Sequence, residues 1–393
     1  VGNPCVPGGS PRGIGEFIRQ APGRYFSYDP PDGRAEPIYR YLPDATTPLG
    51  LVTNAMGWRG PPLQQPRSPR SIRVAFLGAS TTANPHDFPF SYPEFVVGWL
   101  NIWARDKKLD VAFEVLNAGR EGLTSRDIEA VARKELLPLL PDLVVYYEGH
   151  NQFDLRSLAS NAPAKGSSPS KKEAAQAPRW LQEASNRSAI ARRVRAAVDK
   201  FNDPDRGAEP QKPDYRLEWP QGLDERDPDL DGNLPVNLGT ILRDLKSIQS
   251  LLDSEQAEFF VSSYKWYVHD GMILDLVDSK WLLQHLNVHM YPFRYRDVER
   301  LAAFQNRVFQ KFARSNGIGF IDVASYMPDR PDLYTDAVHF TYAGVRLHAW
   351  IVLQKLLPHI EKKIQTGAWP RKPVGSADRL PAYAPREVKL DCP

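Results

Sequence analysis

Short apolar runs alternate with longer amphipathic stretches through the middle of the chain. Residues 74–77 form a continuous apolar run that ends at Gly78, which is typical of a strand buried on both faces of a parallel sheet. Four further runs of this character occupy 111–116, 143–147, 259–263 and 319–322. Stretches with helical periodicity occupy 92–106, 125–137, 237–253, 298–316 and 342–364. The alternation predicts an α/β fold: a three-layer α/β/α domain around a parallel five-stranded sheet.

Three stretches depart from this alternation. Residues 1–70 are rich in Gly, Pro and Arg and predict an irregular N-terminal wrap. Residues 155–235 interrupt the core and are too long for an ordinary loop, so they predict an insertion or lid. Residues 366–393 are Pro-rich and predict an extended C-terminal tail. The core domain is therefore expected at 71–365.

The insertion contains one segment with helical character, 179–201. Apolar residues recur at helical spacing at Ile190, Val194, Ala197 and Phe201. Basic residues fill the opposite face, namely Arg187, Arg192, Arg193, Arg195 and Lys200. Such a helix could pack on the core as a surface helix. It could also act as a moving lid whose basic face contacts an anionic glycan or a membrane surface.

Composition restricts the class of protein. Charged residues make up 25% of the chain and nearly cancel to a net charge of +3, so we expect no nucleic-acid partner. No run of about 18 apolar residues occurs, which argues against a membrane-spanning helix in this sequence. The sequence begins with Val, which suggests a processed chain whose targeting segment is missing. Its oligomeric state cannot be inferred from these features.

The chain has two cysteines, Cys5 and Cys392, and they lie at its opposite ends. They could form a disulfide that joins the two tails, or they could be two unrelated thiols. A disulfide would indicate an oxidising compartment. We expect an exported protein, periplasmic or extracellular.

Candidate catalytic residues follow the predicted strands, because ligands of parallel α/β sheets bind at the carboxyl ends of the strands. Ser80 follows the first strand on a turn of small residues that could expose a nucleophilic hydroxyl, although a serine there could also cap the next helix. Asp336 and His339 precede the last helix. Their spacing could place a carboxylate against an imidazole, as a Ser-His-Asp triad requires, or Asp336 could cap that helix.

Potential donors to an oxyanion follow the second and third strands. Gly119 lies just after the second strand, and Asn151 lies just after the third. A glycine amide and an asparagine side-chain amide are suitable donors, as is the backbone amide of Ser80. Each residue taken alone would suit an ordinary turn equally well.

The order of these four elements resembles that of the SGNH hydrolase family, also called GDSL-like esterases, over residues 73–360. The matching blocks are Gly78-Ala79-Ser80, Asn117-Ala118-Gly119 with Gly122, Gly149-His150-Asn151-Gln152, and Asp336-Ala337-Val338-His339. The chain departs from the family pattern at Ala79, where the family usually has aspartate, and at Gln152, where aspartate often follows the asparagine. Residues 54–60 are also similar to a leader found in some exported bacterial SGNH proteins.

This resemblance implies a flavodoxin-like SGNH fold and assigns roles to the candidate residues. Ser80 would be the nucleophile, His339 the general base and Asp336 its orienting partner. The oxyanion donors would be the amides of Ser80, Gly119 and Asn151. The implied activity is hydrolysis of an acyl or acetyl ester of a glycan or small molecule through an acyl-enzyme, without a cofactor. An O-acyltransferase using the same triad, or a catalytically silent carbohydrate-binding or assembly protein, are the alternatives.

Two further features bear on ligands. The aromatic residues Trp180, Tyr215 and Trp219 of the insertion could stack on sugar rings, or they could hold the insertion against the core. The chain has eight histidines, but none has zinc-like spacing such as H-E-x-x-H. His285 and His289 are four residues apart and could share a helix face, but no glutamate lies between them. We therefore expect no metal site.

Overall fold

The structure is a computed structural model. It describes residues 25–28, 41, 43–44, 52–84, 90–159, 215–219, 223–224, 227–232, 234–235, 237–272, 279–371 and 385–388. The predicted insertion helix at 179–201, Trp180 and both cysteines, Cys5 and Cys392, lie outside these residues.

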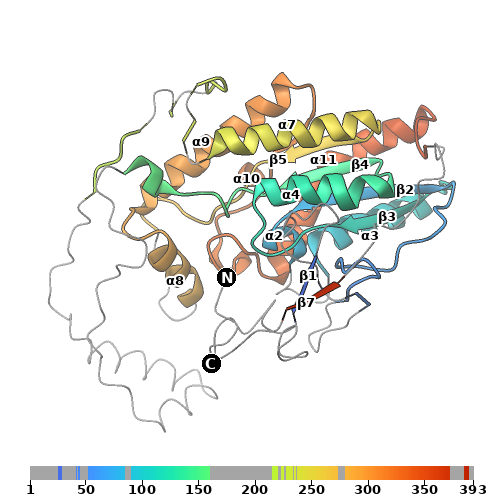
Figure 1. Ribbon diagram of the computed structural model, residues 1–393, viewed down its shortest axis with the longest axis horizontal. Coiled ribbons are helices and arrows are strands. Elements are labelled where there is room, and N and C mark those ends of the chain that lie inside the picture. Colours follow the sequence, from blue (N-terminus) through green and yellow to red (C-terminus); the bar gives the residue numbers. More distant parts are fainter. Residues whose placement is uncertain are drawn as a thin grey trace, which may run out of the picture.

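A parallel sheet of five strands forms the centre of the molecule, in the order β3-β2-β4-β5-β6 (Figure 1). The strands are β2 (Ser71–Gly78), β3 (Ala112–Asn117), β4 (Leu143–Tyr147), β5 (Glu258–Ser262) and β6 (Gly319–Ile321). Every residue of β2 and β4 is buried, as expected when helices cover both faces of a sheet. The predicted α/β class and the five parallel strands are confirmed.

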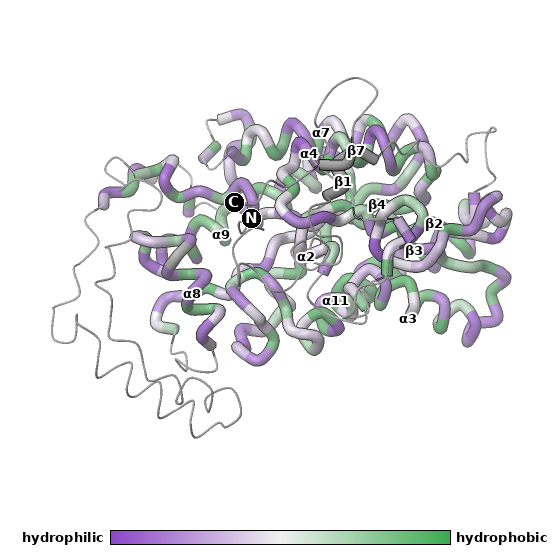
Figure 2. Tube along the Cα trace, turned by 60° about the horizontal axis from the view of Figure 1, so that its bottom comes forward, coloured by the Kyte–Doolittle hydropathy of each residue, from purple (hydrophilic) through white to green (hydrophobic). Residues whose placement is uncertain are grey.

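Helices cover the two faces of the sheet and complete a three-layer arrangement. Helix α3 (Tyr92–Asp106) packs against α11 (Tyr342–Gln365) on one face. The other face is covered by α4 (Ser125–Val131), α7 (Leu238–Ser254) and α9 (Tyr295–Ser315) (Figure 1). Buried residues in α7 recur every three or four positions, and hydrophobic and hydrophilic residues alternate along it in Figure 2.

The expected helix at 125–137 is not one regular element. After α4 the chain forms a π-helical turn over Ala132–Leu136 and then a 3₁₀ turn over Leu137–Leu139. Pro138 lacks a backbone N–H, and Leu140 adopts a left-handed conformation with φ 49°, so the helix cannot continue. The predicted helix at 125–137 is thus helical throughout, but its second half is a π-helical turn that leads into a 3₁₀ turn and is not regular α-helix.

Three elements were not anticipated from the sequence. Strand β1 (Tyr25–Tyr28) pairs antiparallel with β7 (Pro385–Val388), so parts of the expected wrap and tail form a two-stranded sheet. Helix α8 (Lys280–His289) follows β5 and precedes α9 in the chain. It lies off one end of the main sheet, at the lower left of Figure 1. A single turn, α2 (Ser80–Ala83), follows β2. Short 3₁₀ turns at Leu155–Leu158 and Pro331–Leu333 and the turn α10 (Val323–Tyr326) complete the described elements.

The described ends of the insertion lie side by side. Ala159 and Leu217 form an antiparallel bridge, and the amide of Glu218 donates to the carbonyl of Leu158 at 2.8 Å. The intervening chain therefore leaves and returns at one place, shortly after Asn151. Within the described part of the chain, no helix is both long and apolar enough to cross a membrane.

Candidate active site

Ser80, His339 and Asp336 form a continuous hydrogen-bonded series. The Nε2 atom of His339 lies 2.8 Å from the Oγ of Ser80, and its Nδ1 lies 2.7 Å from Oδ2 of Asp336. The His339 and Asp336 side chains keep 15% and 24% of their surface exposed, so a substrate can reach this series. These contacts are those of a Ser-His-Asp triad, joined across residues far apart in the chain.

Close packing fixes the turn that carries Ser80. A Cβ on Gly78 would lie 2.1 Å from the hydroxyl of Thr82 and 2.4 Å from the carbonyl of Tyr147, so only glycine fits there. The Thr82 hydroxyl donates to that same carbonyl at 3.2 Å. Ser80 is the first residue of α2, just after the carboxyl end of β2, the strand that lies between β3 and β4. A helix leaves the N–H groups of its first turn without partners among its own carbonyls, so this position suits an oxyanion donor.

Two side chains from other parts of the chain hold the end of α2. The Asn117 side-chain amide donates to the carbonyl of Thr82 and to the hydroxyl of Ser91, both at 3.1 Å. Arg59 donates to the carbonyls of Ala83 and Asn84. It also forms a buried ion pair with Glu94 at 2.9 Å. These contacts position the nucleophile turn, and sequence reasoning had missed the role of Arg59 in them.

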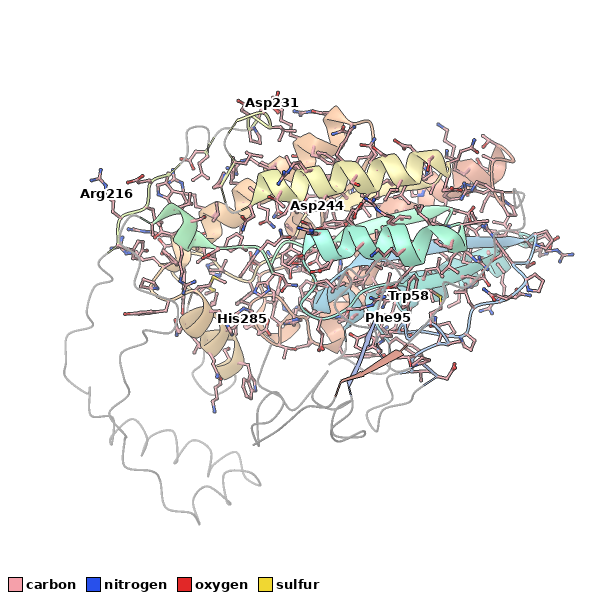
Figure 3. All side chains as sticks on the ribbon, viewed as in Figure 1. Trp58, Phe95, Arg216, Asp231, Asp244 and His285 are labelled. Atoms are coloured by element: carbon pink, nitrogen blue, oxygen red, sulfur yellow. The ribbon has the colours of Figure 1, made fainter. Side chains whose placement is uncertain are left out.

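The segment at residues 54–60, which stands out in the sequence, could have indicated that Arg59 has a structural role. In the structure this segment is a buried turn in which Oδ1 of Asn54 accepts from the amides of Met56 and Trp58, at 3.0 and 3.1 Å. The indole of Trp58, labelled in Figure 3, donates to Glu135 at 3.0 Å. The turn thereby fixes the direction in which Arg59 enters the core.

The Asp336 carboxylate is held by four donors. Its Oδ1 accepts from the backbone amides of Val338 and His339, each at 2.9 Å, and lies 3.1 Å from Nδ1 of His285. Its Oδ2 contacts His339. Burial opposes the charge, but the charges and hydrogen bonds of His339 and His285 outweigh it and hold the pKa of Asp336 well below its ordinary value. The carboxylate is therefore ionised and can orient His339.

The two other predicted oxyanion residues follow the strands on either side of β2: Gly119 comes after β3, and Asn151 comes after β4. A Cβ on Gly119 would lie 2.6 Å from the backbone nitrogen of Ala83, so this glycine packs directly against α2. Its N–H donates to Oδ1 of Asn117 at 3.1 Å. The Asn151 side-chain amide donates to the carbonyl of Leu123 at 2.7 Å and has a second hydrogen on the same nitrogen. The oxyanion roles of Ser80, Gly119 and Asn151 stay predictions.

A buried glutamate organises the loop that carries Asn151. Oε1 of Glu148 accepts from the amides of His150 and Asn151, at 2.7 and 2.8 Å. Burial raises the pKa of Glu148 to about 7, although these backbone hydrogen bonds oppose the shift. Glu148 is thus the most strongly perturbed acid of this loop, and its protonation changes near neutral pH.

The insertion aromatics that the structure describes pack against α9. The hydroxyl of Tyr215 donates to Asp297 and accepts from the amide of Arg294, and its ring contacts Phe293 edge-on. Trp219 lies under the guanidinium of Arg300, 4.5 Å from it. Of the two expectations for Tyr215 and Trp219, the packing role is therefore the one observed.

His285 and His289 do share one face of α8, with ring centroids 5.0 Å apart. Among the described residues, no group of three or more His, Cys, Asp or Glu side chains is arranged to hold a metal ion. His285 instead contacts Asp336, and no pattern in the sequence predicts this contact.

No protein-family model matches the chain, and no curated protein matches it significantly. Solved structures similar to it include a lipase/acylhydrolase from Enterococcus faecalis, with 14% identity, TM-score 0.38, and 73% of this chain and 96% of that chain covered. A catalytic mutant of an acetylxylan esterase from Geobacillus stearothermophilus has 14% identity and TM-score 0.40, with 72% and 94% covered. A GDSL-like lipase from Bacteroides thetaiotaomicron has 14% identity and TM-score 0.36, with 76% and 92% covered.

Proposed function

We propose that this protein is an SGNH-type ester hydrolase. In its reaction the acyl group of the ester is transferred to Ser80 and then to water. The single observation that supports this most strongly is the series Ser80–His339–Asp336, with 2.8 Å and 2.7 Å between consecutive partners. A serine hydroxyl is a weak nucleophile unless a base accepts its proton, and His339 is within reach of that proton.

In the first step, Oγ of Ser80 attacks the carbonyl carbon of the ester while His339 accepts the hydroxyl proton. Asp336 stabilises the resulting imidazolium and keeps Nε2 directed at the serine. The tetrahedral intermediate then expels the alcohol, which takes the proton from His339. In the second step, His339 deprotonates a water molecule that attacks the acyl-enzyme, and the acid is released as Ser80 recovers its proton.

The oxyanion of each tetrahedral intermediate would be bound by the N–H of Ser80 and the side-chain amide of Asn151. Gly119 can contribute only if its N–H is shared with, or released from, Oδ1 of Asn117. Asn117 would therefore determine whether the N–H of Gly119 is available as the third oxyanion donor. Preorganised donors of this kind each lower the activation free energy by about 3 to 4 kcal/mol.

The acyl-enzyme is common to hydrolysis and to acyl transfer, and the difference lies in whether water or a sugar hydroxyl attacks it. Our proposed substrate class is an acyl or acetyl ester on a glycan or small molecule, encountered outside the cytoplasm. Product partition measured with and without glycan acceptors separates the two reactions, because a transferase forms an acylated acceptor in place of free acid.

The test of the proposed function is Ser80→Ala, assayed on p-nitrophenyl acetate. The methyl group fits the same turn but has no nucleophile, so hydrolysis is expected to fall by up to about a million-fold with an unchanged circular dichroism spectrum. Ser254→Ala, at the end of α7, is the matched serine control and keeps wild-type turnover. A folded Ser80→Ala variant with more than about a tenth of wild-type activity would contradict the proposal.

A further inference from the structure

His285 contacts the aspartate of the triad on the oxygen that His339 does not use. Nδ1 of His285 lies 3.1 Å from Oδ1 of Asp336, whereas Nδ1 of His339 lies 2.7 Å from Oδ2. His285 comes from α8 (Figure 3) and is 8% exposed. Because an ionised carboxylate only accepts hydrogen bonds, Nδ1 of His285 carries a proton in this contact.

The other nitrogen of His285 continues the series to the loop of Asn151. Its Nε2 lies 3.2 Å from Nε2 of His150, and Nδ1 of His150 lies 3.3 Å from Oδ1 of Asn151. The Asn151 amide nitrogen is directed at the carbonyl of Leu123, so its oxygen faces His150. A hydrogen-bonded series therefore runs from Asp336 through two imidazoles to a predicted oxyanion residue.

The protons of this series can be counted. Asp336 and Asn151 each require an N–H from the adjacent imidazole, and the two Nε2 atoms require one proton between them. Three protons on two imidazoles make one positive charge. Burial and the charges of His285 and His339 lower the pKa of His150 to about 3, so His150 itself is uncharged near neutral pH.

We propose that His285 is a positioning residue of the triad: its Nδ1–H holds Oδ1 of Asp336, and through that carboxylate it sets the basicity of His339. This inference rests on the proposed function of the triad. The titratable groups that face His285 are Asp336 from the loop before α11, His150 from the loop after β4, and His289 from its own helix. His339 and Glu148 lie one contact further away.

The physical basis is competition for one carboxylate. An opposite charge stabilises a protonated imidazole, and a carboxylate that already accepts another N–H stabilises it less. Loss of the His285 donor therefore strengthens the attraction between Asp336 and protonated His339, and His339 then titrates at higher pH. The same loss leaves Oδ1 with only the backbone amides of Val338 and His339, so the carboxylate is held less firmly.

The experiment is a histidine NMR titration of the full chain as wild type, His285→Leu and His285→Asn, with the His339 signal assigned from His339→Gln. Leucine removes the donor, whereas asparagine retains a side-chain N–H. We expect the His339 midpoint at the highest pH in His285→Leu, with His285→Asn between that variant and wild type. The acid limb of kcat/KM on p-nitrophenyl acetate moves in the same order, and kcat of His285→Leu falls about ten- to a hundredfold because the aspartate is misplaced.

Gln284→Leu, at an exposed neighbour on α8, is the control for general disturbance of the helix and leaves both readouts unchanged. An unmoved His339 midpoint in His285→Leu, or equal shifts in the leucine and asparagine variants, overturns the inference. If His285→Leu does not fold, His285→Phe replaces it and is judged by the same criteria. The titration does not depend on turnover. If the His339 midpoint shifts in the His285 variants as expected but the wild-type protein has no esterase activity, only the proposed function is contradicted.

Discussion

Two clusters of charged side chains lie at opposite ends of the same parallel sheet. At the amino ends of the strands, Asp142 accepts from the amide of Arg73 and the guanidinium of Arg371, both at 2.7 Å, and from the guanidinium of Arg67. The side chain of Asp142 is 0% exposed. At the carboxyl ends, Asp336 has four donors to the three of Asp142, but it keeps 24% of its side-chain surface exposed and is connected to Ser80 through His339.

The comparison indicates that the number of hydrogen-bond partners does not distinguish the structural carboxylate of Asp142 from the carboxylate of Asp336, for which we propose a catalytic role. Both aspartates accept several hydrogen bonds. Asp142 is enclosed by the guanidinium groups of Arg67 and Arg371, whereas Asp336 contacts His339, the proposed base, which lies 2.8 Å from the hydroxyl of Ser80. Substitutions at the two ends should therefore separate, with the amino end affecting stability and the carboxyl end affecting turnover.

The largest expected effect is on turnover at the carboxyl end. His339→Ala removes the base and should lower kcat on p-nitrophenyl acetate nearly as far as Ser80→Ala, by up to about a million-fold. Because the two residues act as one unit, the double variant should be no slower than either single variant. Losses that multiply in the double variant would contradict a shared proton transfer.

The converse effect is expected at Asp142. Asp142→Ala leaves Arg67 and Arg371 without their buried partner and should lower the free energy of unfolding by about 3 to 5 kcal/mol. Urea denaturation measures this loss, and kcat of the remaining folded protein should stay near wild type.

The matched control is Asp110→Ala. Its ion pair with Arg70 has a similar distance, 2.7 Å, but the two side chains are 76% and 66% exposed. Exposed pairs of this kind contribute about 0 to 1 kcal/mol. Equal destabilisation by both variants would show that burial of the Asp142 ion pairs adds nothing to stability.

A smaller loss of turnover is expected at Asn151. Asn151→Ala removes one proposed oxyanion donor and should lower kcat about a hundred- to a thousandfold, with little change in KM. Gln152→Ala controls for the loop, since Oε1 of Gln152 accepts from the amide of Ser125 at 2.6 Å. An Asn151→Ala variant with wild-type turnover would refute the oxyanion role and leave the triad intact.

The smallest effect is a pH dependence of stability caused by Glu148. The folded protein holds the Glu148 proton up to about pH 7, whereas an unfolded glutamate releases it near 4.5. The folded state therefore binds more protons between these values, and stability falls as pH rises through them, by about 3 kcal/mol. Glu148→Gln keeps an oxygen acceptor for both loop amides and should flatten this part of the stability curve.

Urea denaturation between pH 4 and pH 8 measures this contribution as the difference between wild type and Glu148→Gln. Glu255→Gln, at an exposed position after α7, is the control and should follow the wild-type curve. Parallel curves for wild type and Glu148→Gln would show that Glu148 does not change its protonation in this range.

The sheet was predictable because buried parallel strands are uninterrupted apolar runs. The five runs match β2 to β6 with ends displaced by at most one residue, except that β2 begins three residues earlier than its run. Ser80, Asp336 and His339 were predictable because each follows or precedes an element whose position the periodicity indicates. The contact between Ser80 and His339 could be predicted only from the order of the four motifs, because the two residues lie far apart in the sequence.

The contacts that hold the site in place could not be predicted from the sequence, and the reason is physical. Arg59, Asn117 and His285 act through contacts with α2 or Asp336, which lie far away in the sequence, and each contact depends on side-chain direction. The donation from Gly119 to Asn117 likewise arises from a turn conformation that the residue types alone leave open. Sequence patterns indicate which face of an element is buried but not which atom it presents.

The central claim, that Ser80 is a nucleophile activated by His339, is tested most directly by covalent labelling with a fluorophosphonate. Intact-mass and peptide analysis of the wild-type chain should find a single adduct, located on Ser80, and both Ser80→Ala and His339→Ala should remain unlabelled. Folded wild-type protein without an adduct, or with an adduct on another residue, would contradict the account and favour a binding protein that lacks activity.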